Sequence, residues 1–309
     1  SLGMKVLVTG ASGYLGQALI AQLLLKGYRV LALTRTPKNS TQQNLQWVPW
    51  DGKNPAALSP LAAAYFKNIE IVVNLAGEPV VGKNWSAHLK KEIYDSRVHY
   101  TTMIADAALE YSLALQTVLS ASAVGFYGDG GDRILSEEST SGKDFLSEVC
   151  VAWEAAAQRF KSQKNVSVSS LRTGIVLGKN AGALARMLPA FKWGLGGRLG
   201  SGKQWMSWIH EHDYIAALLF LIEKKINGPV NLVAPGAVRN LEFTQTLAHV
   251  LHRPAVFAVP SFALKTAFGE GAEVLLGGQR AEPQVLLKNG FQFKYPTLEM
   301  ALQNLLIES

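Results

Sequence analysis

KVLVTGASGYLG, at residues 5–16, joins an apolar run to a glycine-punctuated turn and then to a segment with helical periodicity. In a parallel α/β sheet, this order of strand, glycine-rich turn and helix presents backbone N–H groups to a pyrophosphate. The first glycine permits the tight turn, the second lets the phosphate approach the backbone, and the third lets the helix pack close to the strand. The alternative is a plain strand-to-helix connection. The cofactor-binding candidates on this turn are Gly10, Ser12, Gly13, Tyr14, Leu15 and Gly16.

The end of the next apolar run, residues 28–34, indicates which dinucleotide is bound. The run ends at Thr34-Arg35, and no Asp or Glu occurs in the first fifty residues. NAD sites usually place an acid near this strand end to bind the ribose 2′-hydroxyl, and the first carboxylate here is Asp51. A guanidinium binds a 2′-phosphate through paired, charge-assisted hydrogen bonds. We therefore predict NADP(H), with Thr34, Arg35 and Asp51 at its adenosine end; the alternative for Arg35 is a solvated strand-end side chain.

Composition limits the class of protein. The chain has 309 residues, of which 48% are hydrophobic, enough for one large domain or two unequal ones. Its net charge of +7 comes from scattered Lys and Arg with no nucleic-acid motif, which favours anionic small molecules over nucleic acid. No apolar run reaches the roughly 18–20 residues of a membrane span, so we expect no membrane association. The single cysteine, Cys150, excludes an internal disulfide and fits the cytoplasm.

Apolar runs alternate with helical patterns through about residue 175, which predicts an α/β fold with a Rossmann-type doubly wound parallel sheet. We expect residues 4–178 to form an NADP-binding Rossmann domain, with part of 205–235 returning to its sheet. Residues 179–309 then form a substrate-side lobe, in which two or three helices make a small C-terminal domain from about residue 254. The expected strands are 4–9, 28–34, 45–49, 69–74, 115–121, 166–172 and 229–233, and the expected helices are 14–26, 56–67, 86–111, 144–162, 212–225 and 241–252.

Six motifs in a fixed order point to one family. They are GASGYLG at 10–16, NLAGEP at 74–79, SASAVGFYG at 120–128, LRTGIVLG at 171–178, GSGKQWMSWIHEHD at 200–213 and LGGQR at 276–280. With these motifs the chain resembles the atypical epimerase-family branch of the extended short-chain dehydrogenase/reductase superfamily. Members of this branch are labelled sugar-nucleotide epimerase or cell division inhibitor, and they end in a short C-terminal domain.

The resemblance adds cofactor-binding candidates beyond the glycine-rich turn. Small residues after the fourth strand would allow close approach of adenosine and ribose. On the following helix, Arg97 would reach the cofactor with help from Glu92; the alternative for both is a solvated helix-face charge. Ile175 would contact the nicotinamide end, and its alternative is core packing. The candidates are Leu75, Ala76, Gly77, Glu92, Arg97 and Ile175.

Catalysis in this superfamily uses a Ser or Thr together with Tyr-x-x-x-Lys, whose spacing places both side chains on one helix face. Ser122 fits the serine role. If Glu154 is aligned with an acid common in relatives, Leu146 and Cys150 occupy the tyrosine and lysine positions. A shift of one residue offers only Phe145 and Val149, so neither alignment supplies the pair.

Tyr127 is the best substitute, because a neutral tyrosine can donate a proton during carbonyl reduction. Its alternative is aromatic packing over the sheet edge. On the opposite wall, Trp205, His210 and Arg280 are the substrate-binding candidates. His210 and His212 lie two residues apart with no third ligand near them, so we predict no metal.

The sequence is compatible with two functions. The first is an NADP(H)-dependent oxidoreductase or epimerase acting on a small polar or nucleotide-linked molecule. The alternative is a non-catalytic NADP(H) sensor, which the missing Tyr–Lys pair favours. Relatives often dimerise through two helices, so we expect a monomer or a homodimer.

Overall fold

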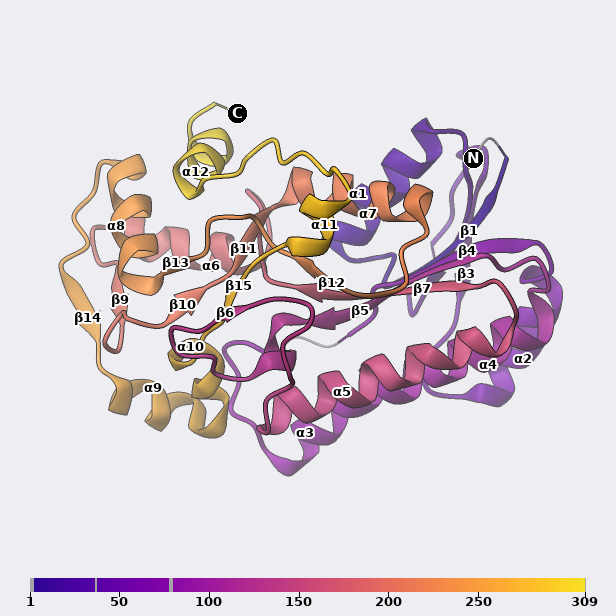
Figure 1. The fold of residues 1–309 in the computed structure, drawn as a ribbon, viewed down its shortest axis with the longest axis horizontal. Helices are drawn as coiled ribbons and strands as arrows, with labels where there is room; N and C mark the ends of the chain where they lie inside the picture. The colour runs from indigo at the N-terminus through magenta and orange to yellow at the C-terminus, as the bar shows by residue number, and fades with distance from the viewer. Residues whose placement is uncertain (1–2, 37, 78–79, 309) are drawn as a thin grey trace.

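Seven parallel strands form the central sheet of the computed structural model, which describes residues 3–36, 38–77 and 80–308 (Figure 1). Their order is β12-β7-β5-β4-β1-β2-β3, so the direction of winding reverses between β1 and β4. Ligands of such sheets bind beyond the carboxyl ends of the strands at this reversal. The strands are β1 (Lys5–Thr9), β2 (Arg29–Thr34), β3 (Leu45–Pro49), β4 (Ile69–Asn74), β5 (Thr117–Ala123), β7 (Ser167–Thr173) and β12 (Gly228–Leu232).

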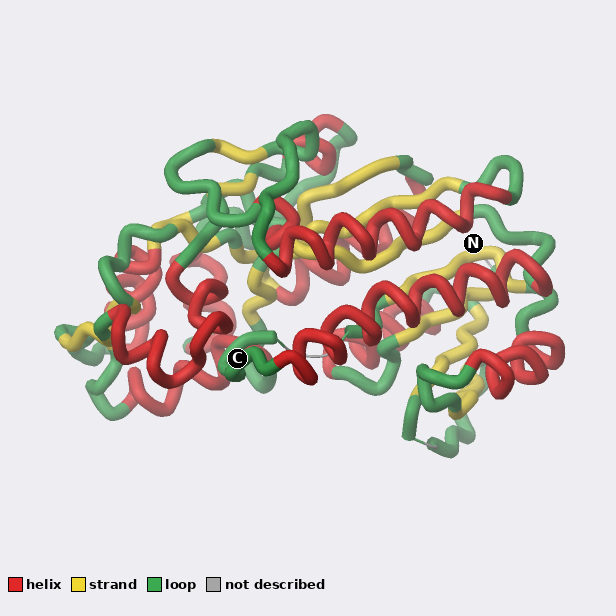
Figure 2. The backbone as a smooth tube through the Cα atoms, turned by 90° about the horizontal axis from the view of Figure 1, so that it is seen from below, coloured by secondary structure: helices red, strands yellow, loops and turns green. Residues whose placement is uncertain are grey.

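Helices cover both faces of this sheet. The apolar strand residues are buried on both sides, as parallel strands require, and they form one cluster with α1 and α7 and another with α2 and α4. Figure 2 shows two long helical segments side by side in front of the sheet; they are α5 and the run from α3 through α4. These helices are α1 (Tyr14–Leu25), α2 (Pro55–Tyr65), α3 (Ala87–Tyr94), α4 (Tyr100–Tyr111), α5 (Phe145–Ala157) and α7 (Glu211–Lys224).

The predicted fold class is confirmed, and the expected strands of the sheet lie within two residues of the observed ones. The helix expected over 86–111 is one continuous helical run, because a π-helical segment, Asp95–His99, joins α3 to α4. The helix expected over 144–162 ends in a 3-10 turn, Gln158–Ser162. Of the NLAGEP motif, Glu78 and Pro79 lie outside the described residues.

The second lobe packs around its own apolar cluster, which α6, α8 and α12 supply. Four pairs of short strands lie outside the central sheet: β6 with β15, β8 with β11, β9 with β14, and β10 with β13. The elements of the second lobe and of these pairs are β6 (Ile134–Leu135), β8 (Ile175–Leu177), α6 (Gly182–Lys192), β9 (Gly197–Leu199), β10 (Trp205–Met206), β11 (Trp208–His210), β13 (Val238–Arg239), α8 (Asn240–Leu251), β14 (Phe257–Val259), α9 (Ser261–Phe268), α10 (Glu273–Leu276), β15 (Arg280–Ala281), α11 (Gln284–Lys288) and α12 (Leu298–Leu306).

The C-terminal part contains more helices than the two or three expected from about residue 254. Four α-helices follow residue 254 within the described part of the chain, and two of them are only four or five residues long. Such short helices carry too little periodicity to be recognised in a sequence. Leu286 of α11 packs in the same cluster as Leu19 of α1 and Leu218 of α7, so the chain end returns to the Rossmann core. Of the helices described, none has the length and apolar character that crossing a bilayer requires.

Candidate functional site

A cavity of about 1000 Å³ lies beside the carboxyl ends of β1, β2 and β4, where the strand order reverses. Thirteen of the fifteen predicted cofactor residues line it. The structure therefore gathers four separate sequence motifs around one space, large enough for a dinucleotide. The thirteen are Gly10, Ser12, Gly13, Tyr14, Leu15, Gly16, Thr34, Arg35, Asp51, Leu75, Ala76, Gly77 and Glu92.

The glycine-rich turn brings the backbone to the cavity. Gly10 has a φ of +66°, and a Cβ there would lie 2.8 Å from the carbonyl carbon of Leu75. A Cβ at Gly16 would lie 2.3 Å from the carbonyl oxygen of Gly10, so helix and turn approach each other as the motif predicts. Gly13 is the N-cap of α1, and it has no side chain that could accept hydrogen bonds from the N–H groups of the first helical turn. That turn contains no Asp or Glu. These N–H groups are therefore suited to an anion.

The far end of the cavity carries two cations. Arg35 follows β2, and Lys53, which the sequence reasoning missed, follows β3; both line the cavity. Lys53 could have been suspected only from its place after a strand end. Asp51 between them accepts hydrogen bonds from the backbone N–H groups of Asn54 (2.9 Å) and Lys53 (2.8 Å), which lower the pKa of its carboxyl. Both bonds go to Oδ1 of Asp51, so this oxygen holds the turn.

Near the start of α7, a hydrogen bond joins two residues that line the cavity. The Tyr14 hydroxyl donates to Oε2 of Glu211 at 2.6 Å, and this bond is the main reason why the pKa of Tyr14 rises to about 12. A Cβ at Gly178 would lie 2.5 Å from the same Oε2, so a side chain there would displace the Glu211 carboxylate. Glu211 was not among the predicted residues, although it lies in the 200–213 motif.

The two remaining cofactor candidates lie just outside the described lining. The Cζ atom of Arg97 lies 5.2 Å from the centre of the Trp153 ring and 3.2 Å from where a Cβ of Gly77 would be. Arg97 therefore lies directly behind a cavity residue. Ile175 packs against the core of the second lobe, and its neighbour Val176 lines the cavity instead. Successive residues of a strand face opposite sides, so Ile175 faces the core while Val176 faces the cavity. This position matches the core-packing alternative for Ile175.

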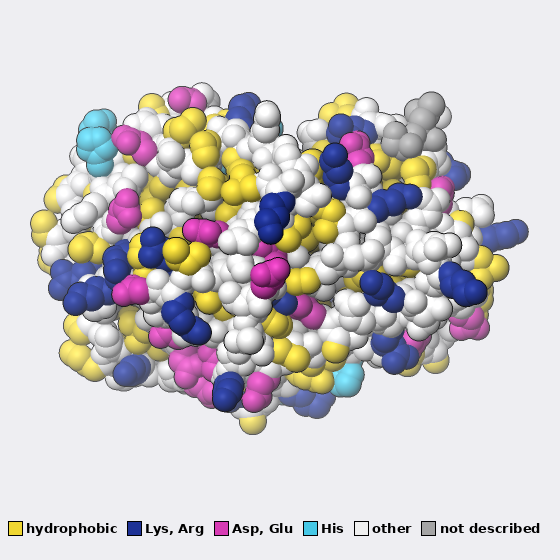
Figure 3. Space-filling view, in the orientation of Figure 1, with side chains coloured by type: hydrophobic (Ala, Val, Ile, Leu, Met, Phe, Trp, Pro, Cys, Tyr) yellow, Lys and Arg dark blue, Asp and Glu magenta, His cyan; other side chains and the backbone are white. Residues whose placement is uncertain are grey.

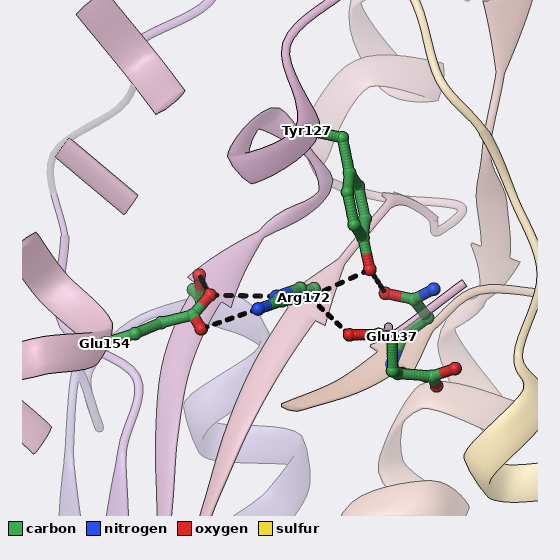
Figure 4. Close-up of polar contacts among 6 residues, drawn as sticks. Tyr127, Glu137, Glu154 and Arg172 are labelled. Carbon is green, nitrogen blue, oxygen red and sulfur yellow. Dashed lines mark hydrogen bonds and ion pairs between the residues drawn. The ribbon is translucent and has the colours of Figure 1, made fainter. Parts of the chain in front are cut away.

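The two catalytic candidates belong to a buried polar network (Figure 4). Ser122 donates a hydrogen bond to Oε2 of Glu154 at 2.6 Å, and Arg172 pairs with both oxygens of the same carboxylate at 3.0 and 2.9 Å. Arg172 also donates to the hydroxyl of Tyr127 at 3.1 Å, and that hydroxyl donates to Oδ1 of Asn231 at 2.6 Å. None of the five residues is on the described cavity lining. Both candidate hydroxyls are thus engaged within the protein.

Burial determines the protonation of the groups around this network. Tyr127 is 2% exposed, and desolvation raises the pKa of its hydroxyl. The surroundings of Tyr127 therefore match the alternative interpretation, an aromatic ring packed over the sheet edge. Cys150, aligned with the family's lysine, is buried, and burial raises the pKa of its thiol to about 12. Cys150 consequently keeps its proton at neutral pH. Leu146, aligned with the tyrosine, belongs to a small apolar cluster with Trp85 and Phe145.

Trp205 and Arg280, two of the substrate candidates, lie together in the second lobe. The Arg280 guanidinium carbon is 4.3 Å from the centre of the Trp205 ring, and that of Arg239 is 4.8 Å from it. The Trp205 indole donates to Asp132 at 2.8 Å, and Arg239 pairs with the same carboxylate. None of these side chains is part of the described cavity lining.

His210 has a structural position, which corrects its prediction as a substrate residue. The side chain is 3% exposed. Its Nδ1 accepts from the backbone N–H of His212, its Nε2 bonds Oδ1 of Asn304 at 2.8 Å, and its ring stacks on Tyr295 at 4.0 Å. Both ring nitrogens are therefore used, and burial lowers the pKa of the imidazole. No group of three potential metal ligands occurs within residues 3–36, 38–77 and 80–308.

Comparison with known proteins extends over nearly the whole chain. Residues 6–233 match the NAD dependent epimerase/dehydratase family, and residues 259–305 match a domain of unknown function, DUF1731. Epimerase family protein Mb2239 of Mycobacterium bovis is 41% identical over 96% of each chain. The chloroplastic SDR39U1 homologue of Arabidopsis thaliana is 40% identical over 97% of this chain and 86% of its own. The crystal structure of human epimerase family protein SDR39U1 with NADPH is 32% identical and covers 98% of this chain and 99% of its own, with a TM-score of 0.87.

Proposed function

The chain belongs to the NAD-dependent epimerase/dehydratase family, and on that premise we propose that its cavity binds NADP(H) in preference to NAD(H). One observation carries this proposal: Arg35 after β2 and Lys53 after β3 line the cavity, while Oδ1 of Asp51 is engaged in its own turn. Two cations suit a 2′-phosphate, whereas a ribose 2′-hydroxyl is usually bound by an available acid. The relative crystallised with NADPH supports the same choice.

The residues present fit the rest of such a cofactor. The N–H groups at the start of α1 would hold the pyrophosphate, and Leu75, Ala76 and Gly77 would lie along the ribose. Val176 would contact the nicotinamide end in place of Ile175. When bound, NADP(H) supplies hydride chemistry.

We further propose an oxidoreductase or epimerase that acts on a small polar or nucleotide-linked molecule. The Trp205 ring with the Arg280 guanidinium suits a planar or phosphorylated group of such a substrate. Ser122, at the carboxyl end of β5, is the catalytic candidate, and Glu154 fixes the direction of its hydroxyl. Tyr127 reaches Ser122 only through Arg172 and Glu154, so it acts as a positioning residue.

Cofactor preference is tested by calorimetric titration with NADPH and NADH. We expect NADPH to bind at least about tenfold more tightly, since one charge-assisted contact is worth 1.5–3 kcal/mol. Lys53→Ala should weaken NADPH much more than NADH, whereas Lys67→Ala, an exposed lysine outside the cavity, should change neither. Equal or tighter binding of NADH to the unmodified protein would contradict the proposal.

Turnover is tested separately, by NADPH oxidation with a panel of carbonyl compounds and nucleotide sugars. Ser122→Ala should abolish any turnover found, while Ser162→Ala, at an exposed serine, should retain it. Absence of turnover across the panel by protein that binds NADPH would remove the enzymatic part of the proposal.

A non-catalytic NADP(H) sensor is the second candidate. The protonated thiol of Cys150 and the engaged hydroxyls of Ser122 and Tyr127 favour it, because none of the three is prepared for proton exchange. A sensor requires a partner whose affinity depends on the dinucleotide. If the protein retains a partner equally well with and without NADPH in a pull-down, this function is excluded.

A further inference from the structure

One end of the second lobe exposes large apolar side chains from three separate segments. Five of them form what we call the end patch: Trp193 (81% exposed), Val256 (80%), Phe262 (74%), Leu195 (63%) and Phe257 (54%). Soluble proteins rarely expose so many large apolar groups in one region without a binding role.

Backbone and side-chain contacts bring these segments together. Phe257 in β14 pairs with Gly197 in β9, just beyond Leu195. A Cβ at Gly194, beside Trp193, would lie 3.5 Å from Cγ of Pro254, and Nε of Arg253 donates to the carbonyl of Lys192 at 3.1 Å. The third segment, α9 with Phe262, follows β14 directly. The patch is therefore a product of the tertiary structure.

The surroundings of the end patch are basic. Residues 179–210 and 243–269 contain no Asp or Glu but seven Lys and Arg. Four of these cations are exposed beside the patch, and none forms an ion pair with a carboxylate in the described part of the chain. In Figure 3, dark blue and yellow side chains gather at the left end, over β9, β14 and α9, with a few magenta side chains among them. The four are Lys192, Arg198, Arg253 and Lys265.

We propose that the end patch binds an anionic lipid surface. Aromatic and aliphatic side chains flanked by Lys and Arg are the composition of proteins that lie on such surfaces, where the apolar groups enter the interface and the cations face the headgroup phosphates. None of the five patch residues is part of the described cavity lining, so the inference does not rest on the proposed cofactor.

Two other occupants fit the observations less well. A second copy of the chain would bring the same unpaired cations face to face, which opposes association. An acidic peptide added as a strand would pair with β14, but β14 has three residues, so it offers few backbone hydrogen bonds. The most exposed side chains, Trp193, Val256 and Phe262, also lie outside that strand.

The lipid proposal departs from the sequence-based expectation of no membrane association. That expectation rested on the absence of a long apolar run, and it concerns crossing a bilayer. Residues 193, 195, 256, 257 and 262 form no continuous pattern in the sequence. Contact with a lipid surface therefore becomes visible only after folding.

The test is flotation of the purified protein with two kinds of vesicle, phosphatidylcholine alone and phosphatidylcholine with phosphatidylglycerol. We expect the protein to float with the anionic vesicles and to be released as salt is raised. Trp193→Ala with Phe262→Ala should lower the partition coefficient at least about tenfold. Lys192→Glu with Arg253→Glu should lower it at least about tenfold as well.

The matched control is Leu25→Ala with Lys26→Glu, which alters an exposed leucine and its neighbouring lysine at the end of α1. This control should float like the unmodified protein, and unchanged thermal unfolding of all variants keeps the comparison valid. Failure to float with anionic vesicles would overturn the proposal, as would equal loss in the control. The proposal would also be overturned if the apolar variant floats normally while soluble poly-glutamate prevents the protein from binding the vesicles. A third contrary result would be a dimer in sedimentation that the patch substitutions dissociate.

Discussion

Replacement of Arg172 by methionine tests the buried network most directly. Arg172 is 4% exposed, gives two hydrogen bonds to Glu154 and one each to the Tyr127 hydroxyl and the Glu137 carbonyl, and stacks on the Phe126 ring at 3.5 Å. Methionine keeps much of the apolar stem but removes the charge and every donor. The Glu154 side chain, 13% exposed, then loses its cation. Removing one partner of a buried ion pair costs about 3–5 kcal/mol, a large share of the roughly 5–15 kcal/mol that stabilises a typical domain.

The assay is denaturant unfolding at neutral pH with two comparisons. Arg159→Met removes an ion pair with Asp106 whose side chains are 50% and 51% exposed, so we expect a loss below about 1 kcal/mol. Glu154→Gln combined with Arg172→Met should be more stable than Arg172→Met alone, because no charge is left buried. The reasoning is refuted if Arg172→Met loses no more than Arg159→Met, or if the losses at Glu154 and Arg172 simply add.

Three further outcomes follow from the site and its surroundings. Arg35→Glu should weaken NADPH at least about tenfold by calorimetry and NADH much less, since only NADPH carries the 2′-phosphate; equal losses would indicate a role in folding. Cys150, whose burial raises the thiol pKa to about 12, should hold only about one thiolate in ten thousand at pH 8, so iodoacetamide should label it only after unfolding. Burial lowers the pKa of His210 from 6.5, so as the pH falls the unfolded chain binds a proton at this imidazole before the folded protein does. The free energy of unfolding should therefore decrease below pH 6.5, and it should decrease less in His210→Gln. A His210→Gln profile parallel to that of the unmodified protein would contradict this assignment.

The cofactor half of the site was predictable because its signals are local. Gly10 and Gly16 are required by contacts within one strand, turn and helix, and their spacing is visible in consecutive residues. Arg35 takes its place from the end of β2, which an apolar run marks. Parallel strands align their carboxyl ends, so motifs far apart in the chain were expected at one edge of the sheet, and the structure places them there.

The surroundings of single polar side chains were not predictable in the same way. Tyr127 forms a hydrogen bond with Asn231, which lies 104 positions further along the chain, and His210 forms one with Asn304, 94 positions further. The sequence shows that a hydroxyl or an imidazole is present, but not whether its partners leave it open to a ligand. Lys53 likewise became a cavity residue only when β3 was placed beside β2, and Glu211 only when α7 was packed against α1.

The chain's local patterns alone thus determined its doubly wound sheet, its dinucleotide turn and the positive charge after the second strand. Tertiary structure decided which polar groups are buried, which residues close the cavity and which apolar side chains meet in the end patch. The reason is range: backbone propensity and periodicity act over a few residues, whereas burial and hydrogen-bond pairing depend on segments that only the packed fold brings together.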